Sequence, residues 1–176
     1  MSGSFIVIEG VDASGKGTQA ERLVERLESE GEEVKYVNFP RYDTKFGSLV
    51  GKYLRGEFGE REEIPEEIRC MFYAMDRYQF KDEFNEFLKD DGIIVSDRYT
   101  QSNLGYQAAD FEGKEKKEMI NWIEDLERRI PQPDTVLFLD VKPEMKEIYR
   151  RKMSNSRKRS IRPIMNSPRK ETTGEG

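Results

Sequence analysis

A short segment near the N-terminus has the spacing of a phosphate-binding loop. Gly10 and Gly15 enclose four residues and are followed by Lys16, which matches the first seven positions of the P-loop pattern G-x-x-x-x-G-K-[ST]. Glycines let the backbone turn so that several N–H groups point at phosphate oxygens, and the lysine adds a full positive charge. We therefore predict that the phosphates of a nucleotide are bound by Gly10, Val11, Asp12, Ala13, Ser14, Gly15, Lys16, Gly17 and Thr18.

The eighth position of this loop departs from the pattern. Gly17 stands where a Ser or Thr hydroxyl usually holds magnesium, and Thr18 comes one place later. We therefore do not rely on direct ligation of the metal by a loop hydroxyl. The run Gly15–Gln19 is similar to that of adenylate kinases, so the glycine is compatible with a kinase. The alternative interpretation is a glycine turn with a surface lysine.

A second group with chemical potential is the pair Asp97 and Arg98. The pair directly follows the apolar run Ile93–Ser96, which is a candidate for a buried parallel strand. Ligands of open α/β sheets bind beyond the carboxyl ends of the strands, and arginine forks suit phosphate oxygens. We therefore expect both side chains at the reaction centre. The alternative is a surface ion pair at the end of a strand.

Alternating apolar runs and helical patterns must place these groups. The predicted strands are Phe5–Glu9, Glu33–Asn38, Gly92–Ser96 and Thr135–Leu139. The predicted helices are Gly15–Glu30, one that follows Gly47, a long one from about Pro65 to Leu88, and Lys114–Arg129. Strands that alternate with helices indicate an α/β fold, a three-layer parallel sheet of the P-loop NTPase type with helices on both faces.

The composition excludes several classes of function. Net charge is −5, which argues against a nucleic-acid partner, and the chain has no histidine for imidazole base catalysis or His-ligated zinc. A single cysteine, Cys70, excludes an intramolecular disulfide and favours the reduced cytoplasm. The run Phe5–Ile8 is far too short to span a bilayer, so we expect no membrane association.

Three further segments resemble one family. Phe39–Tyr42, Asp76-Arg77 and Asp97–Gln107 occur in the order and at about the spacing seen in thymidylate kinases, and the resemblance covers roughly Phe5 to Val141. The chain thus resembles the thymidylate kinase family of P-loop nucleoside monophosphate kinases. This resemblance implies phosphorylation of dTMP to dTDP by ATP and Mg²⁺, and a homodimer. A kinase for another nucleoside monophosphate shares the phosphate machinery and stays open as an alternative.

The resemblance also implies roles at the phosphates. Lys16 would stabilise the transferring phosphoryl group, Arg98 would hold the acceptor phosphate, and Asp97 would support magnesium or its waters. Asp12 would face the 3′-hydroxyl of the acceptor sugar. The alternative for Asp12 is a loop aspartate bonded to its own backbone.

At the base, the resemblance implies stacking on Tyr73, an arginine at Arg77 that reaches a base carbonyl, and an amide at Asn103 that reads the pyrimidine edge. Tyr106 would lie beside the sugar and disfavour a 2′-hydroxyl. Tyr73 could equally be a core residue of an amphipathic helix, and Arg41 is one residue away from its place in other branches of the family. The complete predicted dTMP site is Asp12, Phe39, Arg41, Tyr42, Tyr73, Arg77, Arg98, Ser102, Asn103 and Tyr106.

The C-terminal segment breaks the pattern. We predict a kinase domain over 1–153 and a basic, disordered tail over 154–176 in place of the lid, last strand and last helix. Their loss would expose the apolar faces of Thr135–Leu139 and Lys114–Arg129, so a nucleotide-binding but inactive kinase is a further alternative. The abrupt shift from patterned to unpatterned sequence suggests that the reading frame changes near Met153. Reading the gene in the other two frames past that point would test this hypothesis. Candidate lid arginines are Arg150, Arg151, Arg157, Arg159 and Arg162.

Overall fold

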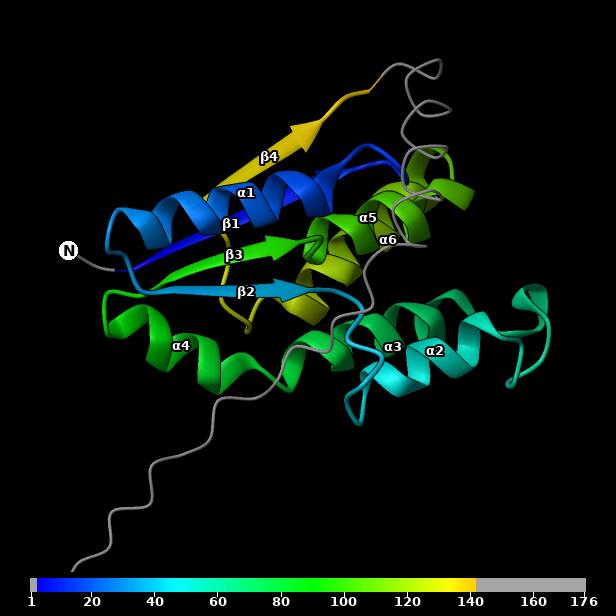
Figure 1. Cartoon of the computed structure of the whole chain (residues 1–176). Coiled ribbons are helices and arrows are strands. Elements are labelled where there is room, and N and C mark those ends of the chain that lie inside the picture. The colour runs from blue at the N-terminus through cyan, green and yellow to red at the C-terminus, as the bar shows by residue number, and fades with distance from the viewer. Residues whose placement is uncertain (1–2, 142–176) are drawn as a thin grey trace, which may run out of the picture.

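The computed structural model of the chain describes residues 3–141, and in this part four parallel strands form one sheet (Figure 1). The strands are β1 (Ser4–Gly10), β2 (Val34–Asn38), β3 (Ile93–Asp97) and β4 (Thr135–Leu139), in the order β2-β3-β1-β4. Ile8 of β1 lies opposite Asp97 of β3, and Gly10 lies opposite Leu139 of β4. This register brings the carboxyl ends of β1 and β3 together.

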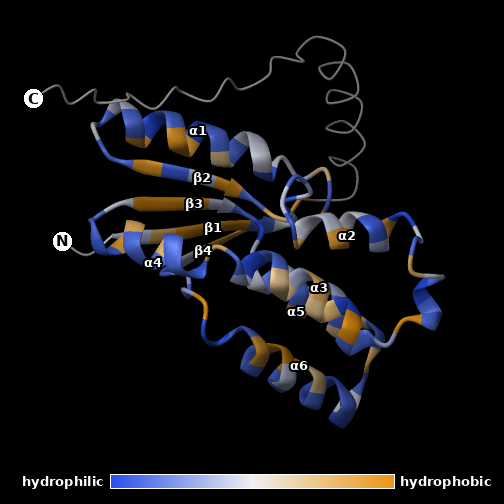
Figure 2. Cartoon of the chain, turned by 90° about the horizontal axis from the view of Figure 1, so that it is seen from below, coloured by the Kyte–Doolittle hydropathy of each residue, from blue (hydrophilic) through white to orange (hydrophobic). Residues whose placement is uncertain are grey.

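Helices cover both faces of the sheet. They are α1 (Lys16–Ser29), α2 (Gly47–Leu54), α3 (Glu66–Tyr78), α4 (Lys81–Lys89), α5 (Thr100–Gln107) and α6 (Gly113–Glu127), with short 3-10 turns at Arg61–Glu63 and Ala108–Asp110. On one face, Ala20 of α1 packs with Ile8 and Val95. On the other face, Phe84 of α4 packs with Phe5. Figure 2 shows α1 and α4 on opposite sides of the sheet. The predicted three-layer α/β fold is confirmed.

A separate apolar cluster joins three helices beyond the edge of the sheet layers. Cys70 of α3, Ala108 after α5, and Met119 and Ile123 of α6 are all buried together. The expectation that the apolar face of α6 would be exposed is therefore wrong for Met119 and Ile123. Their burial against α3 and α5 fixes the spacing of the three helices that surround the site described below.

The predicted long helix over Pro65–Leu88 is wrong, because the chain forms two helices there. α3 ends at Tyr78 and α4 begins at Lys81. Phe80 lies at the break, where its ring packs against Phe39 and Phe84 at centroid distances of 5.9 and 5.7 Å. The break turns the chain from the helix cluster back onto the sheet, so one continuous helix could not serve both cores.

α5 is an additional helix that the sequence did not predict, because its Gln, Ser, Asn and Gly residues give no apolar period.

β4 forms the outer strand of the described sheet, and its side chains are partly uncovered. Val136, Leu137 and Phe138 are 41%, 46% and 64% exposed.

No helix within residues 3–141 is long and apolar enough to cross a membrane. The predicted tail over 154–176 and its candidate lid arginines lie outside the described residues.

Candidate functional site

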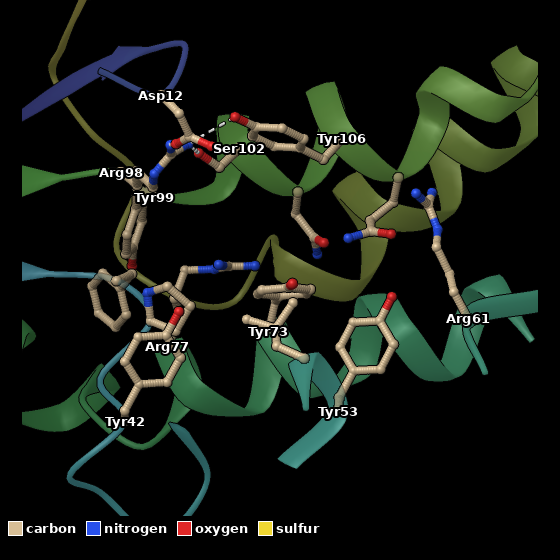
Figure 3. Close-up of a pocket in the computed structure, with 15 residues that line it drawn as sticks. Asp12, Tyr42, Tyr53, Arg61, Tyr73, Arg77, Arg98, Tyr99, Ser102 and Tyr106 are labelled. Atoms are coloured by element: carbon tan, nitrogen blue, oxygen red, sulfur yellow. Dashed lines mark hydrogen bonds and ion pairs between the residues drawn. The ribbon is translucent and has the colours of Figure 1, made fainter. Parts of the chain in front are cut away.

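A cavity of about 390 Å³ opens at the carboxyl ends of β1 and β3 and extends between the helices (Figure 3). Nine of the ten residues predicted to contact dTMP line this cavity: Asp12, Phe39, Tyr42, Tyr73, Arg77, Arg98, Ser102, Asn103 and Tyr106. Figure 3 shows Asp12, Arg98 and Tyr106 gathered on one side of the hollow, with Tyr53 and Tyr73 on another. The fold thus brings together side chains that are far apart in sequence.

The loop between β1 and α1 has the backbone shape of a phosphate-binding turn. Gly10, Ala13 and Gly15 have φ angles of 149°, 62° and 88°. At Gly10 a side chain is also excluded by space, because a Cβ there would lie 2.8 Å from the carbonyl oxygen of Leu139. Positive φ and close backbone approach both require glycine at this position. The turn places Lys16 at the start of α1.

Lys16 is held inside this loop. Its side chain is buried, and Nζ donates a 2.9 Å hydrogen bond to the carbonyl oxygen of Val11. Burial lowers the pKa of Lys16, and the nearby positive charge of Arg98 lowers it further. A lysine whose charge is poorly solvated gains more from a neighbouring phosphate than one exposed to water.

Asp97 lies against the first turn of α1. A Cβ at Gly17 would be 3.3 Å from Oδ2 of Asp97, so the glycine allows the helix to approach this carboxylate. Oδ1 of Asp97 is buried and has no hydrogen-bond partner among the described residues. Burial raises the pKa of Asp97, an effect that Lys16 opposes. An unpartnered carboxylate oxygen beside a phosphate-binding loop fits a ligand to magnesium or to one of its waters.

Residues 3–141 contain no cluster of three or more Cys, Asp or Glu side chains that could hold a metal by themselves. This finding is compatible with magnesium, which usually takes one or two carboxylates and completes its shell with waters and substrate phosphates.

Arg98 occupies a fixed turn immediately after β3. Its φ angle is 70°, its N–H donates to the carbonyl of Ile8 at 3.0 Å, and its own carbonyl accepts from Oγ of Ser96 at 2.6 Å. The guanidinium pairs with Asp12 and donates to Oγ of Ser102 at 3.2 Å. Backbone and side chain are therefore both held, which suits a residue that must meet a phosphate in one geometry.

Glu9 supports the same turn from β1. Its carboxylate is buried and accepts the Tyr99 N–H at 3.0 Å and the Ser102 hydroxyl at 2.9 Å. Ser102 in turn contacts Arg98, whose guanidinium also lies 3.4 Å from the hydroxyl of Tyr106. Sequence reasoning missed Glu9, although its place at the end of a predicted strand and beside the loop was a usable signal.

The far end of the cavity is aromatic. Tyr73 of α3 lies on the cavity wall, and its ring meets that of Tyr53 of α2 edge-on at 6.4 Å. Burial raises the pKa of Tyr73 to about 12, so the phenol stays neutral at physiological pH. A neutral aromatic wall provides a face for a nucleobase.

Two polar side chains of the lining complete this end, and both contact a buried carboxylate on a third helix. Arg77 of α3 donates from Nε to Glu127 of α6 at 3.0 Å and also pairs with it through Nη2. Asn103 of α5 donates from Nδ2 to the same Glu127 oxygen at 3.3 Å. Glu127 lies at the end of a helix predicted only as amphipathic, so nothing in the sequence marked it.

Arg41 is the predicted residue that the structure does not bring to the cavity. Its backbone N–H donates to Asp76 at 2.9 Å, and its guanidinium lies over the Phe80 ring and 3.5 Å from Asp43. Six lining residues were missed by sequence reasoning: Pro40, Tyr53, Leu54, Arg61, Tyr99 and Gln107. Pro40, Tyr99 and Gln107 lie inside the quoted motifs, whereas Tyr53, Leu54 and Arg61 carry no local signal.

Comparisons with known proteins agree with this architecture. The sequence model of the family described as Thymidylate kinase matches residues 8–167, which extends beyond Val141 and Met153, where the sequence pattern fades. The chain is 36% identical to a probable thymidylate kinase of Thermococcus kodakarensis, over 86% of this chain and 74% of that protein. It is 31% identical to thymidylate kinase of Plasmodium falciparum, over 80% and 63%, and 30% identical to the human enzyme, over 79% and 61%.

Solved structures give the same result. Thymidylate kinase from Candida albicans superposes with a TM-score of 0.67 at 30% identity, covering 83% of this chain and 66% of that one. Compared with the Plasmodium and human proteins, this chain matches less than two thirds of their length. With the family match spanning most of the sequence and with the phosphate loop, the Asp97-Arg98 turn and the cavity in place, this chain belongs to the thymidylate kinase family.

Proposed function

We propose that the protein transfers the terminal phosphoryl group of ATP to dTMP and so forms dTDP. The observation that carries this proposal is one cavity that joins the Arg98 turn to an aromatic, amide-lined pocket. The positive charge of Arg98 also acts on Lys16 of the phosphate loop and lowers its pKa. Phosphoryl transfer asks the protein mainly to position two anionic groups and to neutralise the charge between them. Family membership supports the same reaction.

At the reacting phosphates, we assign distinct tasks to two cations. The backbone of the loop and Lys16 bind the donor phosphates, and Arg98 binds the phosphate of dTMP. The guanidinium of Arg98 is paired with Asp12. The incoming phosphate therefore either displaces the Asp12 carboxylate or binds the guanidinium together with it. Asp12 is then free to accept a hydrogen bond from the 3′-hydroxyl of the sugar.

Magnesium fits the donor end of the site. Asp97 would hold the ion directly or through water, and the ion would offset the negative charge of the phosphates. Gly17 supplies no hydroxyl, so Asp97 would hold the metal that a P-loop Ser or Thr helps to hold in other NTPases.

The remaining assignments concern the base and the sugar of dTMP. The base would stack on Tyr73, a base carbonyl would contact Arg77, the pyrimidine edge would contact Asn103, and Tyr106 would lie beside the 2′-position. The homodimer and the cytoplasmic location remain predictions.

A coupled assay on the purified 176-residue chain tests the reaction. ATP consumption is measured with dTMP, AMP, CMP and UMP as acceptors, and dTMP binding is measured in parallel by calorimetry. We expect dTDP formation with clear preference for dTMP. Preference for another acceptor would indicate a different nucleoside monophosphate kinase. Binding of dTMP without ATP consumption would instead identify an inactive nucleotide-binding protein, and the proposed reaction would be wrong.

A further inference from the structure

Glu127 is a buried carboxylate at the meeting point of three helices beside the cavity. It is 2% exposed, lies on α6, and contacts Arg77 of α3 and Asn103 of α5. Arg77 and Asn103 line the cavity, whereas Glu127 does not. Glu127 therefore acts on a ligand only through the two residues that it holds.

The contacts of Asn103 fix the direction of its amide. Nδ2 lies 3.3 Å from Oε1 of Glu127 and 3.3 Å from the carbonyl oxygen of Cys70. An ionised carboxylate and a carbonyl only accept hydrogen bonds, so the amide nitrogen must face both of them. Oδ1 is consequently turned the other way, and it is buried with no partner among the described residues. Asn103 thus carries an unused acceptor on a side chain of the cavity wall.

Arg77 is restrained by the same carboxylate. Its Nε and Nη2 are committed to Glu127, which leaves Nη1 outside the ion pair. A guanidinium has only donors to offer. Two residues of the cavity lining therefore keep an uncommitted donor, on Arg77, and an uncommitted acceptor, on Asn103, and one buried residue orients both.

This order of donor and acceptor matches one kind of pyrimidine edge. Thymine and uracil carry a carbonyl at position 4 next to an N–H at position 3, which need one donor and one acceptor. Cytosine carries an amino group next to an unprotonated nitrogen, which reverses the pattern. We propose that Glu127 is a positioning residue that makes the site select thymine or uracil over cytosine. This inference rests on the proposed function only in taking the cavity as the nucleoside monophosphate site.

The test compares dUMP with dCMP, because their bases differ only at positions 3 and 4. Calorimetry on the full chain measures both affinities, and dTMP serves as a reference. Polar groups left unpaired in a buried site reject the wrong ligand strongly, so we expect wild-type protein to prefer dUMP by on the order of a hundredfold. In Glu127→Gln one of the two obligate acceptors that fix Asn103 is lost and Arg77 loses its charged partner, so we expect the preference to fall at least about tenfold.

Glu66→Gln is the matched control. Glu66 forms the other buried glutamate–arginine pair of α3, with Arg69, and does not line the cavity. We expect this variant to lose stability in thermal unfolding while keeping the wild-type preference for dUMP. If both variants lose the preference equally, or if Glu127→Gln keeps it, the inference is overturned.

Two further measurements keep the result interpretable. If Glu127→Gln does not fold, Glu127→Asp retains the charge but shortens the side chain, and we expect an intermediate loss of preference. If the wild-type protein phosphorylates dTMP, we expect Glu127→Gln to change KM for dTMP by a larger factor than kcat. The main readout is binding, so the two proposals can fail separately. A protein that prefers dUMP to dCMP but makes no dTDP would refute the proposed reaction. The role of Glu127 would still be decided by the preference that Glu127→Gln shows.

Discussion

The two ends of the cavity are built by different means. At the phosphate end, the functional groups follow directly from strand ends that the sheet holds in register, Ile8 opposite Asp97. At the base end, Arg77, Asn103 and Glu127 come from three helices that meet only through side-chain packing and hydrogen bonds. Backbone ladders place the groups for phosphoryl transfer, and helix packing places the groups that would distinguish one base from another.

This difference has an energetic side. The main-chain hydrogen bonds at the phosphate end do not depend on which side chains pack nearby, whereas a buried ion pair such as Arg77–Glu127 is costly to break from one side. We therefore expect changes at the phosphate end to lower turnover with the fold intact. Changes at the base end should alter acceptor affinity and specificity first.

The largest expected effect comes from removing either cation at the phosphate end. Lys16→Ala and Arg98→Ala should each lower kcat by at least about 10³-fold, because each removes a charge that stabilises the transferring group. Steady-state ATP consumption with dTMP measures this, and circular dichroism checks the fold. Lys114→Ala, which removes an exposed lysine paired with Glu118, should leave the rate unchanged. An undiminished rate in Lys16→Ala or in Arg98→Ala would contradict the mechanism.

The same division explains what the sequence predicts well. Gly10, Gly15 and Lys16 form a local pattern whose meaning depends only on a preceding strand and a following helix, and both are present. Asp97 and Arg98 were placed by the rule that ligands bind at the carboxyl ends of parallel strands, and they lie at such an end. Where backbone topology determines position, local sequence was sufficient.

The base end shows where local sequence was insufficient. Tyr73 and Arg77 are four residues apart, so their shared helix face was predictable, and both line the cavity. Glu127 is 50 residues from Arg77, and their pairing depends on how α6 docks against α3. The break between α3 and α4 was missed for a similar reason, because the packing of Phe80 against Phe39 is a tertiary contact.

A smaller effect is expected from the aromatic wall of the base end. Tyr73→Leu removes a stacking surface while keeping an apolar side chain, so KM for dTMP should rise about tenfold, with kcat changed less than about threefold. Tyr73→Phe keeps the ring and should keep the wild-type KM. Initial rates over a range of dTMP concentrations separate the two constants. A fall in kcat alone would place Tyr73 with the phosphate machinery and break the proposed division.

The smallest expected effect concerns a hydroxyl that supports the Arg98 turn without facing the cavity. Ser96 is fully buried and donates to the Arg98 carbonyl at 2.6 Å, so Ser96→Ala leaves that carbonyl without this bond, at a cost of about 1 kcal/mol. Because this loss loosens Arg98, we expect kcat to fall about fivefold while KM for dTMP changes little. Ser29→Ala is the control, because Ser29 makes an exposed bond of the same length to the Arg26 carbonyl, far from the cavity. Equal behaviour of the two variants in the rate assay would mean that β3 holds Arg98 through its backbone alone, which would make the contrast between the two ends sharper still.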